Sequence, residues 1–349
     1  MESQKHRVPE DIEAVFAYAD EKGWTDGLPV VPPTPERVQA MLSTQDRAQD
    51  AVIGVLPPKR AEATVEKVAI NAVMAGCKTE YFPVVVAAIE ALAEPKFELY
   101  GVNTTTNPVA PLLIINGPIR QQLNINGSYH VLGPGWRANS TIGRAVSLCM
   151  KNIAGRIPGE VCMGTYKWPG ALSAVIGEFE ERSPWEPLSM ERGFARGDST
   201  VTVVSAIGST NILDIESKES DDFLHTVAYS IVGIGSNNMF PFYGLGEMAV
   251  MLCPDHANLT AKKYTKQQAK EVLLEKTSRI PAWFFPKSRL ERLRSEKAGQ
   301  LQGDYVRLAE RADQFIIIVA GGLGGYHSCF FPTFGDSYAV TKPIRTKKA

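Results

Sequence analysis

Three apolar runs of strand length place the strongest constraint on the fold. They cover residues 109–117, 246–253 and 315–321, and a glycine or proline closes or follows each one. Runs without polar alternation are typical of strands buried on both faces, and helical patterns separate them along the chain. The sequence therefore predicts an α/β fold with mixed, partly parallel sheets flanked by helices and joined by long Pro/Gly-rich loops. The shared pattern of strand, turn and polar loop also indicates a weak internal repeat.

Apolar residues at helical spacing predict helices over residues 64–76, 79–93 and 141–155. The first two lie so close together that we expect a helical hairpin with Cys77 at its hinge. Before them, the prolines of residues 23–35 exclude a helix or a central strand. That segment is expected to be an extended arm lying on another surface.

The length of 349 residues suggests two α/β regions. The first, residues 1–200, contains the Cys77 hinge and the third predicted helix. The second, residues 201–349, ends in the glycine-rich loop GGLGGYHS at residues 321–328.

Charge and apolar character exclude several classes of partner. The chain has 37 basic and 38 acidic residues, a balance that gives no track for nucleic acid. Its apolar runs are too short to span a bilayer, and its first residues lack the apolar core of a secretory signal. The five cysteines are scattered without a CxxC pair, as expected for reduced thiols. We therefore expect a cytoplasmic protein with neither a nucleic-acid nor a membrane partner.

Cys77 is the first candidate for chemistry. It follows one predicted helix and precedes the next, where backbone N–H groups and the helix dipole would stabilise a thiolate. Lys78 adds a cation, and Glu80 or Tyr81 could transfer a proton. The alternative is a small buried residue that packs the hairpin.

The loop GPGWRANS, residues 133–140, is the second candidate. Its glycines allow backbone amides to face one point, and a predicted helix begins directly after it. Arg137 and Arg144 would add donors, and Asn139 and Ser140 lie between them. The pattern favours a site for a carboxylate or phosphate, and the alternative is a capped helix with two solvated arginines.

The loop at residues 321–328 is not a nucleotide-binding loop. It matches neither the dinucleotide nor the P-loop spacing, and no helical pattern follows it. No cofactor is therefore predicted. Gly321 and Gly322 could still form a backbone nest for a ligand, with His327 and Ser328 at the strand end. A structural role for His327 is the alternative, because no acid identifies itself as a partner.

Tryptophans and a second histidine complete the candidates. Trp136 and Trp168 lie in loops and could line a pocket, although loop tryptophans often pin a loop to the core. Asp255 and His256 follow another strand and could join His327 or a cysteine around a metal ion. Capping of a helix is the alternative role for Asp255.

Several long motifs resemble the UGSC-like protein family, and together they extend from about residue 23 to residue 328. They are GWTDGLPVVPPT, INAVMAGCKTEYFPVVVAAIEAL, NGPI, GPGWRANSTIGRA, SPWEPL, CPDHANL and VAGGLGGYHS. The family name refers to a selenocysteine-Gly-Ser-Cys motif, so the resemblance implies thiol or selenol chemistry in some members. This chain has no Cys-Gly-Ser-Cys, which argues against a dithiol redox role here.

Together the residues predict a cofactor-independent enzyme acting on a small, carboxylate-like anion, as a lyase or hydratase. Cys77 would act on a substrate held by Arg137, Asn139, Ser140 and Arg144. Three alternatives stay open: a metal-dependent enzyme, a thiol redox enzyme or thiol-dependent transferase, and a non-catalytic subunit of a larger complex. We expect a homo-oligomer or an assembly with a partner subunit.

Overall fold

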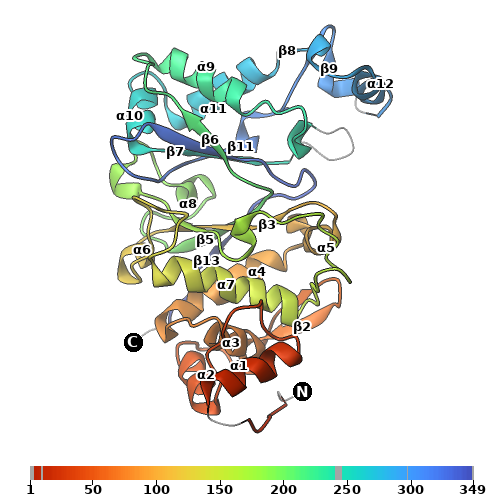
Figure 1. Ribbon diagram of the computed structural model, residues 1–349. Coiled ribbons are helices and arrows are strands. Elements are labelled where there is room, and N and C mark those ends of the chain that lie inside the picture. The colour runs from red at the N-terminus through yellow and green to blue at the C-terminus, as the bar shows by residue number, and fades with distance from the viewer. Residues whose placement is uncertain (1–3, 9–10, 240–245, 297, 348–349) are drawn as a thin grey trace.

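The computed structural model describes residues 4–8, 11–239, 246–296 and 298–347. Two four-stranded sheets lie face to face between two layers of helices, which gives four layers in all (Figure 1). The predicted α/β class with mixed, partly parallel sheets is confirmed.

The first sheet has the strand order β13–β5–β3–β4. These strands are Val340–Pro343, Thr200–Ala206, Ala110–Asn116 and Val175–Gly177. Its outer face is covered by α4 (Phe82–Leu92) and α7 (Arg137–Asn152), and α3 (Val65–Met74) packs against these two helices (Figure 1). Beyond them lie α1 (Ile12–Glu21), α2 (Pro35–Leu42) and the hairpin of β1 (Val52–Leu56) and β2 (Ala61–Thr64).

The second sheet has the order β11–β7–β12–β6. These strands are Phe315–Val319, Met248–Leu252, His327–Phe331 and Thr210–Leu213. Its outer face is covered by α9 (Ser220–Ser230), α10 (Pro254–Ala261) and α11 (Lys266–Thr277) (Figure 1). A small sheet of β8 (Ile280–Pro281), β9 (Leu301–Gln302) and β10 (Tyr305–Val306) lies beside α12 (Lys287–Glu296). Three short helices, α5 (Leu99–Thr104), α6 (Ile119–Gln122) and α8 (Leu188–Glu191), lie in the connections.

Alternating side chains explain why the strand sequences are apolar throughout. In β3, Leu112 and Ile114 face the other sheet, while Leu113 and Ile115 face the helices. In β11, Ile316 and Ile318 likewise belong to the cluster between the sheets. Because successive side chains point to opposite faces, a strand covered on both sides needs apolar residues at every position.

The two sheets share one topology. Each has a parallel pair at one edge, β3 with β4 and β7 with β11, followed by two antiparallel strands. Each half of the chain therefore contributes strand, helix, parallel strand and antiparallel strand in the same order. The fourth strand is exchanged: β6 follows β5 but pairs with β12, and β13 follows β12 but pairs with β5. This arrangement is an internal repeat whose last strands cross between the sheets.

The repeat differs in detail from the sequence pattern. The strand ends at residues 117 and 253 are equivalent, because both follow the first strand of a repeat. The strand end at residue 321 follows β11, whose counterpart is β4. A division after residue 200 falls within β5, so each sheet takes strands from both proposed regions. Among the described residues, no helix combines the length and apolar character needed to cross a membrane.

The exchanged strand β13 should carry much of the stability of the first sheet. Removing residues 340–349 would open the edge of β5 and remove the buried side chains of Val340 and Ile344. We expect the free energy of unfolding to fall by about 3 kcal/mol or more, measured by urea denaturation. Removal of residues 346–349 alone is the control and should leave the transition unchanged. Equal transitions in both truncated chains would show that β13 is dispensable.

Candidate functional site

The Cys77 hinge and the start of α7 do lie against each other. The Cys77 thiol donates to the carbonyl of Thr141 at 3.3 Å. Arg137 donates to the carbonyl of Gly76, from Nη2 at 2.9 Å and from Nε at 3.1 Å. The first helix of the hairpin, α3, ends at Met74, and Gly76 follows its C-cap with a positive φ of 85° that suits glycine. The hinge at Cys77 and the start of α7 are thus neighbours, as the shared substrate site predicted from the sequence requires.

The environment of Cys77 does not favour a thiolate. The residue is only 7 % exposed, and burial raises the pKa of its thiol to about 12 despite the nearby charges of Arg137 and Arg144. Glu80 forms an ion pair with Lys78 at 3.6 Å, and Tyr81 is buried. The packing role for Cys77, the alternative noted from sequence, therefore accounts for every contact that the structure shows.

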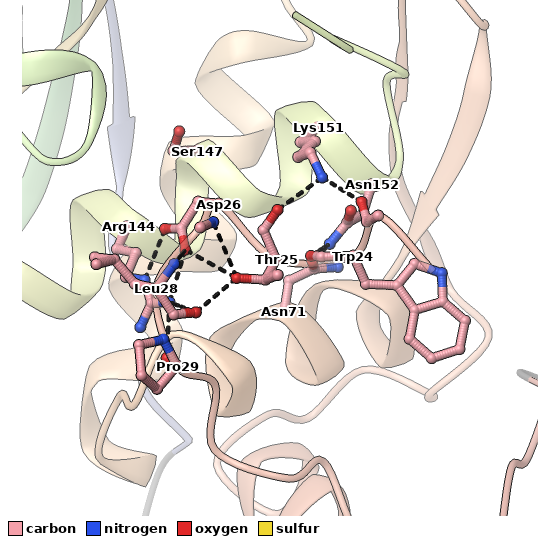
Figure 2. A network of polar contacts seen from close by, with 12 residues as sticks. Trp24, Thr25, Asp26, Leu28, Pro29, Asn71, Arg144, Ser147, Lys151 and Asn152 are labelled. Atoms are coloured by element: carbon pink, nitrogen blue, oxygen red, sulfur yellow. Dashed lines mark hydrogen bonds and ion pairs between the residues drawn. The ribbon is translucent and has the colours of Figure 1, made fainter. Parts of the chain in front are cut away.

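Arg144 holds an anion that belongs to the protein itself. Its Nε and Nη2 donate to the two carboxylate oxygens of Asp26, each at 2.8 Å. Nη2 also donates to the carbonyls of Leu28 at 3.2 Å and Pro29 at 2.9 Å. Figure 2 shows Asp26 and Arg144 at one end of a polar network along α7. The guanidinium of Arg144, which was predicted to bind a substrate anion, thus binds the Asp26 carboxylate of the extended arm instead.

The same helix fixes the rest of the arm. Lys151 donates to the carbonyl of Thr25 at 2.7 Å, and Asn152 donates to that of Trp24 at 3.0 Å (Figure 2). Asn152 also donates to Asn71 on α3 at 2.7 Å. Side chains of α7 therefore satisfy backbone carbonyls of an arm that has no regular secondary structure.

The other residues predicted for the anion site and its pocket, Asn139, Ser140, Trp136 and Trp168, lie in different surroundings and do not form one site. Asn139 exchanges hydrogen bonds with the backbone of Asn126 and donates to the carbonyl of Val175 at 2.9 Å, which ties α7 to β4. Ser140 is exposed, and Trp136 immediately precedes α7. Trp168 is buried in the cluster between the two sheets, where its ring meets the edge of Phe331.

The glycine-rich loop meets the loop before α7. The N–H of Gly321 donates to the carbonyl of Gly127 at 2.9 Å, and the hydroxyl of Tyr129 donates to the carbonyl of Leu323 at 3.3 Å. A Cβ at Gly322 would lie 2.2 Å from the Tyr129 ring, so that close approach requires glycine. Among the described residues, the hydrogen bonds of Cys77 go to Ala72 and Thr141 and not to this loop.

His327 and Ser328 point into different surroundings. His327 is exposed and contacts Asn211 at 2.8 Å. Ser328 is buried; its hydroxyl lies 2.8 Å from Nδ1 of His256 and accepts the N–H of Cys253 at 3.3 Å. The other ring nitrogen of His256 lies 2.8 Å from the carbonyl of Asp214, and burial lowers the pKa of this histidine. The contacts of this pair thus join α10 to β12, to the residue after β7 and to residue 214.

The structure gives the metal alternative no ligand cluster. Asp255 accepts the N–H of Gly324 at 2.6 Å and so anchors the glycine-rich loop. Within the ranges that the structure describes, no three side chains of His, Cys, Asp or Glu gather as a metal site would require.

Glu178 forms a buried polar centre at the ends of β3 and β4. Its carboxylate accepts Asn116 Nδ2 at 2.6 Å and the N–H of Leu188 at 2.8 Å, and Lys266 Nζ lies 4.0 Å away. Burial raises the pKa of Glu178, and Lys266 opposes that shift. The next residue, Phe179, donates its N–H to the carbonyl of Val319 at 2.7 Å and so links the two sheets.

Cys162 is the cysteine that the sequence interpretation missed. It lies in the loop after α7, and two cations converge beside it on the carbonyl of Val109, just before β3. Arg156 Nη2 donates to that carbonyl at 3.1 Å and Lys167 Nζ at 3.0 Å. Lys167 also donates to the carbonyl of Asn107 at 3.0 Å.

These neighbours reverse the usual effect of burial on a thiol. Burial works to raise the pKa of Cys162, but the Gly164 amide and the charges of Arg156 and Lys167 outweigh it and lower the pKa. Burial and the charge of Arg156 lower the pKa of Lys167 to about 8, against the pull of Cys162. The sequence of this segment contains one feature that could have indicated the site: Cys162 has a basic residue on either side, Arg156 before it and Lys167 after it.

Neither the family models nor the curated proteins that were searched contain a match to this chain. The candidate sites therefore rest on the geometry described above.

The ion pair of Asp26 gives a pH-dependent prediction. Burial works to raise the pKa of Asp26, but Arg144 outweighs it and the pKa is lowered. The stabilising contribution is therefore complete above the unfolded pKa and is lost as the pH falls through the folded one. Asp26→Asn should lower the unfolding free energy by about 2 kcal/mol at pH 7, and by progressively less below about pH 4.

Chemical denaturation at several pH values measures this difference. The exposed Asp50→Asn is the matched control and should change stability little at any pH. A loss in Asp26→Asn that is equally large at pH 3 and pH 7 would show that the ion pair is not its source.

Proposed function

We propose that this protein is a thiol-dependent transferase acting on a small anionic substrate, with Cys162 as its nucleophile. The observation that supports this most directly is that Arg156 and Lys167 converge on the Val109 carbonyl beside Cys162. Their charges and the Gly164 amide lower the pKa of the Cys162 thiol. Cationic neighbours and backbone amides are the features that convert a structural thiol into a reactive one. The proposal keeps the predicted class of substrate but moves the chemistry from Cys77 to Cys162.

The charge at Cys162 supports an anionic substrate. Arg156 and Lys167 contribute two positive charges against one thiolate, and no carboxylate is among the groups that shift the Cys162 or Lys167 pKa. A substrate carboxylate or phosphate would therefore be attracted to the loop. Cys162 itself is buried, at 7 % exposed, while Met163 and Tyr166 in the same loop are 51 % and 65 % exposed, so the cysteine lies just beneath an exposed segment.

A group-transfer step follows from these roles. The thiolate attacks the carbonyl carbon of an acyl substrate and forms a carbon–sulfur bond, while the carbonyl electrons move to oxygen. The oxyanion collapses and expels the leaving group, which takes a proton from the Lys167 ammonium. Water or another acceptor then attacks the thioester, gives its proton to the Lys167 amine and releases the Cys162 thiolate. A pKa near 8 suits Lys167 to both proton transfers.

Alkylation by iodoacetamide tests the reactivity of Cys162. Peptide mass spectrometry should show that Cys162 is modified first, with an apparent pKa below the value of about 8.5 for an ordinary thiol. Lys167→Met should raise that apparent pKa and slow alkylation at pH 7, because one cation is lost. Cys77→Ser is the control and should leave the rate at Cys162 unchanged. Alkylation of Cys162 no faster than that of Cys77 or Cys149 would overturn the proposal and favour a non-catalytic role.

A pair of reagents tests the preference for anions. Iodoacetate carries a carboxylate that iodoacetamide lacks, so the two cations should favour iodoacetate at Cys162 relative to free glutathione. The ratio of the two rates should fall toward the glutathione value in Lys167→Met and at high salt. An unchanged ratio in Lys167→Met would show that this site does not select negative charge.

A further inference from the structure

A cavity of about 360 Å³ lies between the β1–β2 hairpin and the segment that joins α4 to α5. Its apolar walls include Val55 and Pro57 on the hairpin side, and Leu92 and Leu99 on the helix side. This volume lies in the range of small-molecule sites, which combine apolar walls with a few polar groups.

The two walls are held together by specific contacts. A Cβ at Gly54 would lie 2.4 Å from the Cβ of Ala93, so the hairpin approaches the end of α4 as closely as glycine allows. Asn103, which is fully buried, donates from Nδ2 to the carbonyl of Pro57 at 2.7 Å, and its Oδ1 has no partner. The cavity therefore lies between anchored walls.

Two charged residues line this cavity in a strained conformation. Arg60, in the hairpin turn, has a φ of 53°, and Glu98, before α5, has a φ of 56°. The left-handed region costs a residue other than glycine about 1 kcal/mol or more, and such strain gathers at functional sites. The fold therefore holds Arg60 and Glu98 at these positions despite the cost of the backbone conformation.

The opposite charges of Arg60 and Glu98 do not meet. Within the described part of the chain, neither side chain forms an ion pair or hydrogen bond, although both line one cavity. Glu94 of the same lining, by contrast, is paired with Lys342. The cavity thus presents an unpaired cation and an unpaired anion around an apolar centre.

We infer that this cavity binds a small zwitterion with an apolar body, such as a free apolar amino acid. The carboxylate of the ligand would contact Arg60 and its ammonium Glu98, while its side chain would lie against Val55, Leu92 and Leu99. The inference does not depend on the reactivity of Cys162, because none of these residues belongs to that cluster.

Isothermal titration calorimetry with leucine, phenylalanine and methionine tests the inference. At least one should bind the full-length protein, and leucine analogues that lack one charge, 4-methylpentanoate and 3-methylbutylamine, should bind more weakly than leucine. Arg60→Gln and Glu98→Gln should each weaken binding of the amino acid about tenfold or more, which corresponds to the loss of one charged contact.

Glu62→Gln, on the same hairpin but outside the cavity, is the matched control and should bind like the unchanged protein. Thermal unfolding of each variant without ligand confirms that it is folded. The inference is overturned if none of the three amino acids binds, or if the Arg60→Gln, Glu98→Gln double variant binds as tightly as the unchanged protein.

Discussion

Burial of both sheets on both faces is the constraint on which the rest of this structure depends. Helices cover one face of each sheet and the other sheet covers the second, so polar side chains are confined largely to strand ends. Glu178 directly follows β4, and His256 lies in the first turn of α10 just after β7; each is held by buried hydrogen bonds. Because an unpaired polar group would be costly there, these contacts fix how the strand ends meet.

Cys77 and Cys162 show that residue type alone does not determine the pKa of a buried thiol. Both are buried free cysteines near arginines. At Cys77 the arginine donors are directed at Gly76 and Asp26, and burial dominates the thiol. At Cys162 the charges of Arg156 and Lys167, together with the Gly164 amide, outweigh burial and lower the pKa of the thiol. The two thiols differ in where the nearby cations lie in the fold, and the spacing of residues along the sequence does not predict this.

Sequence reasoning succeeded where the determining contacts are local. Apolar periodicity located β3, β7, β11 and the hairpin of α3 and α4, because strand and helix repeats are properties of neighbouring residues. Local pattern also placed Cys77 between two helices and found the start of the helix that contains Thr141, and the fold brings the two together. The partner of Arg144 could not be foreseen, since Asp26 lies 118 residues away and only the folded arm brings it there. Strand exchange was equally hidden, because β6 and β13 show the same pattern whichever sheet receives them.

The crossing of β6 and β13 sets an order of assembly during synthesis. The strands β3, β4 and β5 are made long before residues 340–343, so the first sheet has an open edge at β5 until β13 is available. In the second sheet the order is reversed, because the exchanged strand β6 is made before β7 and before its partner β12. The edge of β5 therefore stays unpaired while all the other strands of the second sheet, β7, β11 and β12, are made.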